Sequence, residues 1–132
     1  MLHGSCLCGK VKYEVVGSPL AMYHCYCSTC RAASGASFAT NIAVTTENFK
    51  VTFGKENLSA FESSPGKRRY FCSTCGSPIY SHGEKTKQVV SIRCGTLQGD
   101  PIIRPSFHAY VASKAPWVVI CDELPQYPEA RA

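Results

Sequence analysis

Apolar and polar residues alternate over short stretches of this chain, and glycine or proline separates many of the stretches. In residues 11–16, polar Lys12 and Glu14 alternate with apolar side chains, which is typical of a half-buried strand. The same reasoning predicts short strands at residues 22–25, 37–44, 49–53, 58–61, 69–71, 79–81, 89–93 and 107–111. Breakers such as Gly54 and the pair Pro65 and Gly66 separate neighbouring strands.

Helical periodicity is weak along the whole sequence. Residues 31–35 predict one helical turn that ends at Gly35, and no pattern indicates a helix longer than two turns. Many short strands with regular breakers favour a mainly β fold, and the length favours a single domain over residues 1–132. Residues 124–128 contain two prolines and are expected to run extended over the surface.

The composition, 45% hydrophobic and 17% charged residues, is typical of a globular protein. The first residues lack a basic segment followed by an apolar stretch, and no run approaches the roughly 18 apolar residues of a transmembrane helix. We therefore expect a soluble, cytoplasmic protein without a membrane partner. In that reducing compartment, closely spaced cysteines bind metal more often than they form disulfides.

Seven of the nine cysteines fall into three clusters. The clusters are Cys6-x-Cys8, Cys25-x-Cys27-x-x-Cys30 and Cys72-x-x-Cys75. Four thiolates close a tetrahedral zinc site, whereas three leave one position open for water or substrate. Glycine follows both the first and the last cluster directly, and it tolerates the tight turn of a zinc-binding loop. The count of seven thus suggests one closed and one open site.

Spacing by itself leaves the division of the cysteines undecided. A zinc ribbon could use Cys27, Cys30, Cys72 and Cys75 as its four ligands, which would leave the other three clustered cysteines outside that site. Alternatively, His24 could be a fourth ligand of the second ion, which would make both zinc ions structural. A disulfide framework is disfavoured by the compartment and by the odd number of cysteines.

The formal net charge of +5 could indicate a nucleic-acid partner. Binding of two zinc ions by seven thiolates would lower it to about +2, because the thiolates add seven negative charges and the ions four positive ones. The run Lys67-Arg68-Arg69 is then the remaining basic feature, and we interpret it as a solvated face. Nucleic acid is therefore not the favoured partner.

The cysteine clusters and their flanks resemble a known family. The segments are Gly4-Ser5-Cys6-Leu7-Cys8-Gly9, His24-Cys25-x-Cys27-x-x-Cys30-Arg31 with Ser34-Gly35-Ala36, Phe71-Cys72-x-x-Cys75-Gly76, Arg93-x-Gly95-Thr96-Leu97, Lys114-Ala115-Pro116-Trp117 and Asp122-x-Leu124-Pro125. Together they resemble the glutathione-dependent formaldehyde-activating enzyme family, which shares its domain with centromere protein V. The resemblance covers nearly the whole chain. It implies a β-tent fold of twisted antiparallel sheets, a structural zinc on Cys6, Cys8, Cys72 and Cys75, and a second, open zinc on Cys25, Cys27 and Cys30.

The resemblance also implies a reaction: glutathione and formaldehyde combine to S-hydroxymethylglutathione, which makes the protein a carbon–sulfur lyase. A zinc ion on three thiolates carries a formal charge of −1 and is a weak Lewis acid, so it suits a substrate thiolate better than water. The alternative is a non-catalytic, zinc-stapled module that binds protein or nucleic acid. The sequence leaves self-association into a homo-oligomer open.

Several residues outside the clusters are candidates for the site. His108 could transfer a proton to or from the aldehyde oxygen because histidine titrates near neutrality, with a packed or surface histidine as the alternative. Arg31 and Arg93 could bind the carboxylates of glutathione, with simple solvation as the alternative. We expect Cys94, Cys121 and Trp117 to pack in the core.

Overall fold

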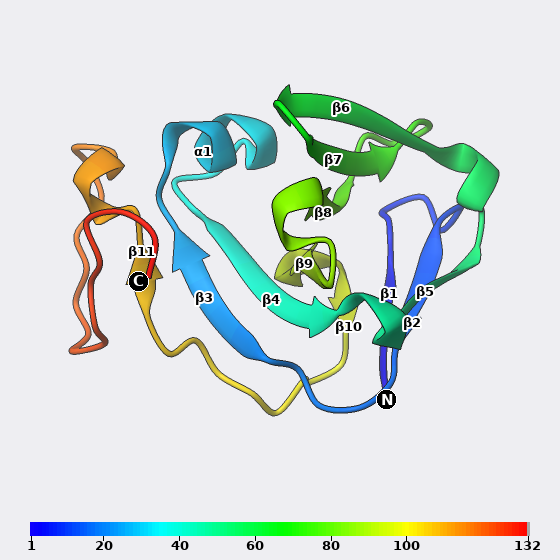
Figure 1. Ribbon diagram of the computed structural model, residues 1–132, viewed down its shortest axis with the longest axis horizontal. Coiled ribbons are helices and arrows are strands. Elements are labelled where there is room, and N and C mark those ends of the chain that lie inside the picture. The colour runs from blue at the N-terminus through cyan, green and yellow to red at the C-terminus, as the bar shows by residue number, and fades with distance from the viewer. Residues whose placement is uncertain (132) are drawn as a thin grey trace.

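Two β-sheets and one short α-helix make up the computed structural model, which describes residues 1–131 (Figure 1). The smaller sheet is antiparallel and joins the start of the chain to later segments. Its strands, in spatial order, are β10 (Leu97–Gln98), β1 (Leu2–Ser5), β2 (Lys12–Val15) and β5 (Phe49–Phe53).

The larger sheet contains the remaining strands that the structure describes. In spatial order they are β11 (His108–Ala109), β3 (Ala21–Cys25), β4 (Ala39–Thr45), β9 (Val89–Arg93), β8 (Pro78–Gly83), β7 (Lys67–Cys72) and β6 (Leu58–Ser64). All its pairs are antiparallel except β11 with β3, which is parallel. Short 3-10 turns join several strands: η1 (Thr46–Asn48), η2 (Lys55–Asn57), η3 (Glu84–Thr86), η4 (Cys94–Thr96) and η5 (Val111–Ser113).

The core lies where apolar side chains of the two sheets meet. Tyr13 and Val15 of β2 belong to one buried cluster with Ile42 and Val44 of β4 and Ile92 of β9. Alternation along a strand sends every second side chain to the same face, so β4 buries Ile42 and Val44 together. Burial of each such side chain stabilises the fold by about 1.5–3 kcal/mol. The other face of the large sheet carries polar residues of several strands, such as Asn41, Ser81 and Ser91, beside a small second cluster around Cys25, Cys30 and Ala39.

Helix α1 (Ser28–Ser34) follows β3 directly. Its N-cap is Cys27, whose sulfur accepts a hydrogen bond from the Cys30 backbone N–H at 3.2 Å. It ends at Gly35, which adopts a left-handed conformation (φ 66°) and donates its N–H to the Arg31 carbonyl. Within the helix only Cys30 is buried, so the helix is anchored through this cysteine.

The mainly β prediction is confirmed, and the observed bounds of β5 and β9 are the predicted ones. The helix begins three residues earlier than expected, and β1 and β10 were not predicted. The predicted strand 107–111 is shorter because Tyr110 turns into a left-handed conformation (φ 59°). Core packing of Trp117 and Cys121 was wrong: Trp117 is 70% exposed and Cys121 is also exposed.

None of the helices described in residues 1–131 is long and apolar enough to cross a bilayer.

Candidate metal sites and the adjoining cavity

Cys6, Cys8, Cys72 and Cys75 form the first cluster, and their sulfur atoms all lie within 4.8 Å of one another. The Cys6 and Cys8 sulfurs are 3.6 Å apart, and the Cys8 and Cys72 sulfurs are 3.8 Å apart. A tetrahedral zinc with Zn–S bonds of about 2.3 Å requires sulfurs about 3.8 Å apart. The four side chains therefore have the spacing of a closed tetrahedral metal site.

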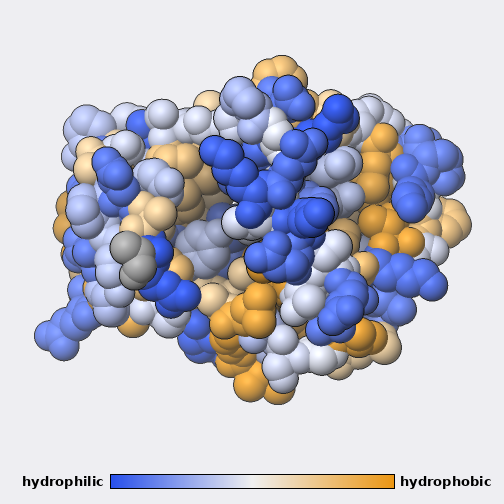
Figure 2. Space-filling model, viewed as in Figure 1, coloured by the Kyte–Doolittle hydropathy of each residue, from blue (hydrophilic) through white to orange (hydrophobic). Residues whose placement is uncertain are grey.

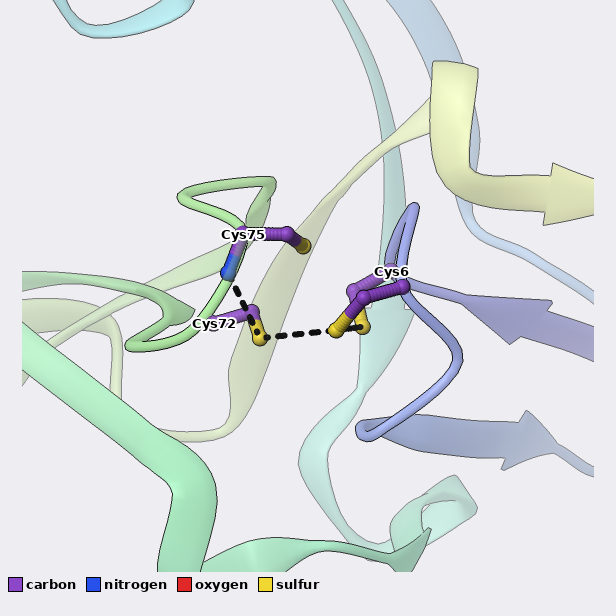
Figure 3. Close-up of side chains that lie close together, drawn as sticks. Cys6, Cys72 and Cys75 are labelled. Atoms are coloured by element: carbon purple, nitrogen blue, oxygen red, sulfur yellow. Dashed lines mark hydrogen bonds between the residues drawn. The ribbon is translucent and has the colours of Figure 1, made fainter.

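Two loops from distant parts of the sequence bring these cysteines together (Figure 3). Cys6 and Cys8 follow β1, while Cys72 ends β7 and Cys75 lies in the turn after it. Backbone N–H groups point at the sulfurs: Val11 donates to Cys6 at 3.2 Å and Cys75 donates to Cys72 at 3.5 Å. Such donors stabilise thiolates and orient them toward a shared ion.

Cys25, Cys27 and Cys30 form the second cluster, again with all sulfurs within 4.8 Å of one another. Cys25 ends β3, and Cys27 and Cys30 lie at the start of α1, so one continuous segment supplies all three. Hydrogen bonds from the Cys25 and Cys27 thiols lower the pKa of Cys30. The charges of Arg69 and Arg93 lower it further. The cluster is thus suited to hold negative charge on sulfur.

The structure groups the clustered cysteines as four and three, which excludes the zinc-ribbon alternative of Cys27 and Cys30 with Cys72 and Cys75. In the part of the chain that the structure describes, His24 does not join the second cluster. Its Nδ1 lies 2.8 Å from Thr40 Oγ1, and its ring stacks against the ring of His108. All nine cysteines are free thiols in residues 1–131, so neither cluster is a disulfide framework.

A cavity of about 320 Å³ opens directly over the second cluster. It lies on the face of the large sheet that points away from the core, and Figure 2 shows this side of the molecule hollowed over β3 and β4. The sheet lines it with alternate residues of neighbouring strands: Tyr23, Cys25, Asn41, Lys67, Arg69, Ser81, Ser91 and Arg93. The polar face of the sheet is therefore the floor of the cavity.

The charged side chains that line the cavity are Lys67, Arg69, Arg93 and Arg131, all of them basic. The Arg69 guanidinium donates to the Cys30 sulfur from both Nη1 and Nη2 at 3.8 Å. Arg93 is only 7% exposed and donates from Nη1 to Asn41 Oδ1 at 2.7 Å. Burial lowers the pKa of Arg93. Among the described residues that line the cavity none is acidic. The cavity is consequently built to receive an anion.

The alternation of β7 divides the run Lys67-Arg68-Arg69, which we interpreted from the sequence as a solvated face. Lys67 and Arg69 line the cavity, whereas Arg68 does not. The strand predicted at residues 69–71 did not include Lys67; only the observed strand β7, which begins at Lys67, puts Lys67 and Arg69 on one face. The sequence could not predict the strand pairing that places β7 beside the second cysteine cluster.

The structure brings Arg93 to the second cluster but brings neither Arg31 nor His108 to the cavity. Arg31 lies on α1, and its buried Nε has no hydrogen-bond partner among the described residues. His108 is 2% exposed, with Nδ1 2.8 Å from Tyr26 Oη and Nε2 2.9 Å from Asp122 Oδ1. Its neighbour Ala109 faces the cavity, so alternation along β11 sends His108 to the opposite side.

The fold and these clusters define a mainly β protein with two cysteine sites that could each hold a metal ion. The family model described as "Glutathione-dependent formaldehyde-activating enzyme" matches residues 1–113. The chain belongs to this family.

Two relatives carry the same family name, and one solved structure shares the fold. A Halomonas elongata protein named "Putative glutathione-dependent formaldehyde-activating enzyme" is 32% identical over 130 residues, covering 91% of this chain and 81% of its own length. A Podospora anserina protein of the same name is 32% identical over 113 residues, covering 82% of this chain and 53% of its own. The crystal structure of a Rhodobacter sphaeroides protein superposes with a TM-score of 0.64 at 25% identity, covering 74% of this chain and 89% of that one.

Proposed function

We propose that the chain binds two zinc ions, one at each cysteine cluster. The first, on Cys6, Cys8, Cys72 and Cys75, would be structural because four sulfurs complete a tetrahedron. The second, on Cys25, Cys27 and Cys30, would keep one position open toward the cavity. The sulfur spacings of 3.6 and 3.8 Å in the first cluster are the main geometric support for zinc. Both sites need reduced thiols, as the cytoplasm provides.

The open site would take a substrate thiol and join it to an aldehyde, or cleave the adduct. When bound there, zinc supplies a centre that lowers the pKa of a thiol while leaving its sulfur nucleophilic. In the forward direction a carbon–sulfur bond forms, the C=O π pair moves to the aldehyde oxygen, and that oxygen takes up a proton. The reverse breaks the same bond. This activity is a carbon–sulfur lyase activity, with glutathione and formaldehyde as the substrates that the family name indicates.

The residues of the cavity suit these steps. Arg69 lies 3.8 Å from the Cys30 sulfur, so its N–H groups could donate to an aldehyde oxygen that approaches the cluster. Tyr110 also lines the cavity, and burial raises the pKa of its phenol. Its hydroxyl therefore stays protonated at neutral pH and could supply the proton. His108 lies on the other face of the sheet, so we assign this transfer to Tyr110 and not to His108.

The single observation that carries the proposal is the three-cysteine cluster that opens into a cavity lined by basic residues. A non-catalytic zinc-stapled module would need no such cavity beside an incomplete set of ligands.

The proposal is tested by the exchange rate between glutathione, formaldehyde and their adduct. Because thiols add to formaldehyde in water without a catalyst, the rate is measured by exchange NMR against a protein-free sample. We expect faster exchange with zinc-loaded protein and with Cys121→Ser, whose thiol lies outside both clusters. We expect the protein-free rate with Cys27→Ser. Exchange at the protein-free rate for the zinc-loaded protein would refute the catalytic proposal and favour the binding module.

A further inference from the structure

The segment of residues 125–131 runs alongside β11 and reaches the cavity. It is held by backbone hydrogen bonds from His108 N–H to the Pro125 carbonyl at 2.9 Å and from Tyr127 N–H to the His108 carbonyl at 2.8 Å. Tyr110 N–H donates in the same way to the Glu129 carbonyl at 3.0 Å. These bonds fix the path of the segment. The cavity is in consequence partly walled by residues beyond the 1–113 range of the family model.

Arg131 is the charged residue that this segment contributes to the cavity wall. Its guanidinium carbon lies 4.2 Å from the centroid of the Phe107 ring. Phe107 in turn stacks on Tyr23, with centroids 5.0 Å apart and an interplanar angle of 5°. Stacking of a guanidinium on a ring uses its flat face and leaves the N–H edges available. Arg131 is therefore held in place while its donors remain free to bind a ligand.

Of the other three basic residues of the cavity, Arg69 and Arg93 have partners in the site, whereas Lys67 offers a point charge and not a planar pair of donors. Arg69 donates to the Cys30 sulfur and Arg93 to Asn41, so both are committed to the inner part of the site. Arg131 forms no ion pair with a carboxylate of residues 1–131. A planar guanidinium that presents two parallel N–H groups matches a carboxylate. The position of Arg131 thus points to a carboxylate-bearing ligand.

We propose that Arg131 binds a carboxylate of the substrate thiol and so makes the cavity selective for anionic thiols over neutral ones. This rests on the proposed function for the identity of the ligand as a thiol. The selectivity determinant lies in the 125–131 segment, so it is a feature of this chain and not of the part matched by the family model.

The test uses S-methylglutathione, which carries both carboxylates of glutathione but has no thiol. S-methylglutathione can bind without a thiolate at zinc and without turnover. The binding measurement can therefore fail while the exchange assay succeeds, or the reverse, so the two proposals are tested separately. We expect the zinc-loaded protein to bind S-methylglutathione more tightly in isothermal titration calorimetry than its diethyl ester, which lacks both carboxylates but keeps the amino group. Arg131→Gln should weaken binding of S-methylglutathione about tenfold, which is about 1.4 kcal/mol, and leave the ester unaffected.

Two further variants make the result specific. Arg131→Lys keeps the charge but loses the paired donors, so it should restore part of the affinity. Arg104→Gln removes one positive charge from an exposed ion pair with Asp100 and should bind as the unsubstituted protein does. Wild-type affinity in Arg131→Gln would overturn the assignment. Equal binding of acid and ester by the unsubstituted protein, or binding of neither, would overturn it as well.

Discussion

Replacement of Cys72 by serine should destabilise this protein more than replacement of Cys27, because the two clusters close loops of different length. The first cluster links residues 64 positions apart, Cys8 and Cys72, whereas Cys25 and Cys30 are five positions apart. A crosslink over the longer separation removes unfolded-state entropy worth about 4 kcal/mol. The difference between the two loop lengths alone corresponds to about 2 kcal/mol.

The expected change in melting temperature follows from these values. For a chain of this size, a loss of about 4 kcal/mol lowers the melting temperature by roughly 15 °C. We expect that shift for Cys72→Ser and roughly half of it for Cys27→Ser. Each variant should lose one zinc ion per chain, and each should lose a different one. Thermal melts at a fixed zinc concentration, with elemental analysis of the purified proteins, measure both quantities.

Cys121→Ser is the matched control, since this exposed thiol belongs to neither cluster. Its melting temperature and zinc content should be unchanged. Equal destabilisation by Cys72→Ser and Cys27→Ser would refute the loop-length reasoning. Retention of two zinc ions by either variant would refute the division into a four-cysteine and a three-cysteine site.

Three other predictions follow from the packing and the electrostatics. Gly54 and Gly99 both have positive φ (78° and 80°), but an alanine Cβ would overlap the Lys10 carbonyl only at Gly54. Gly99→Ala should therefore lower the free energy of unfolding by about 1 kcal/mol and Gly54→Ala by about 3 kcal/mol or more, as measured by urea unfolding. Equal losses in the two variants would contradict this reasoning. Burial raises the pKa of Tyr80 to about 12, so its contribution to stability is complete below about pH 10 and is lost as the pH rises through 12. Tyr80→Phe should reduce the fall in melting temperature over that range, and an unchanged fall would argue against it. His108→Gln should lower stability by about 1–3 kcal/mol without weakening S-methylglutathione binding, and lost binding in a folded variant would place His108 at the site.

The sequence determined much of the fold because alternation of apolar and polar residues is a local property of each strand. Strands β5 and β9 were predicted to the residue. Strands β1 and β10 were missed because β1 is four residues long, β10 is two, and pairing with each other rather than local pattern defines them. The spacing within each cysteine cluster was equally readable, since neighbouring ligands of one loop are close whatever the rest of the chain does.

The tertiary structure decided which cysteines and basic residues from distant parts of the chain lie together. Spacing could not choose between Cys27 and Cys8 as the partners of Cys72, because that choice depends on which loops the two sheets bring together. The family resemblance supplied the answer, and the geometry agrees with it. Likewise, the strand predicted at residues 69–71 did not include Lys67, and only the observed extent of β7 and the order β4-β9-β8-β7 show that Lys67 and Arg69 border the second cluster.

The same distinction explains where the structure places the other candidate residues. His108 was chosen for its chemistry, yet the parallel pairing of β11 with β3 turns it away from the cavity and turns Ala109 toward it. Arg131 gave no local signal at all, because its role depends on the path of the 125–131 segment beside β11. The amino-acid sequence thus determined which chemical groups this protein has, and the register of its strands decided which of them lie close together. Side-chain type is set by each residue alone, whereas proximity is set by contacts between segments far apart in the chain.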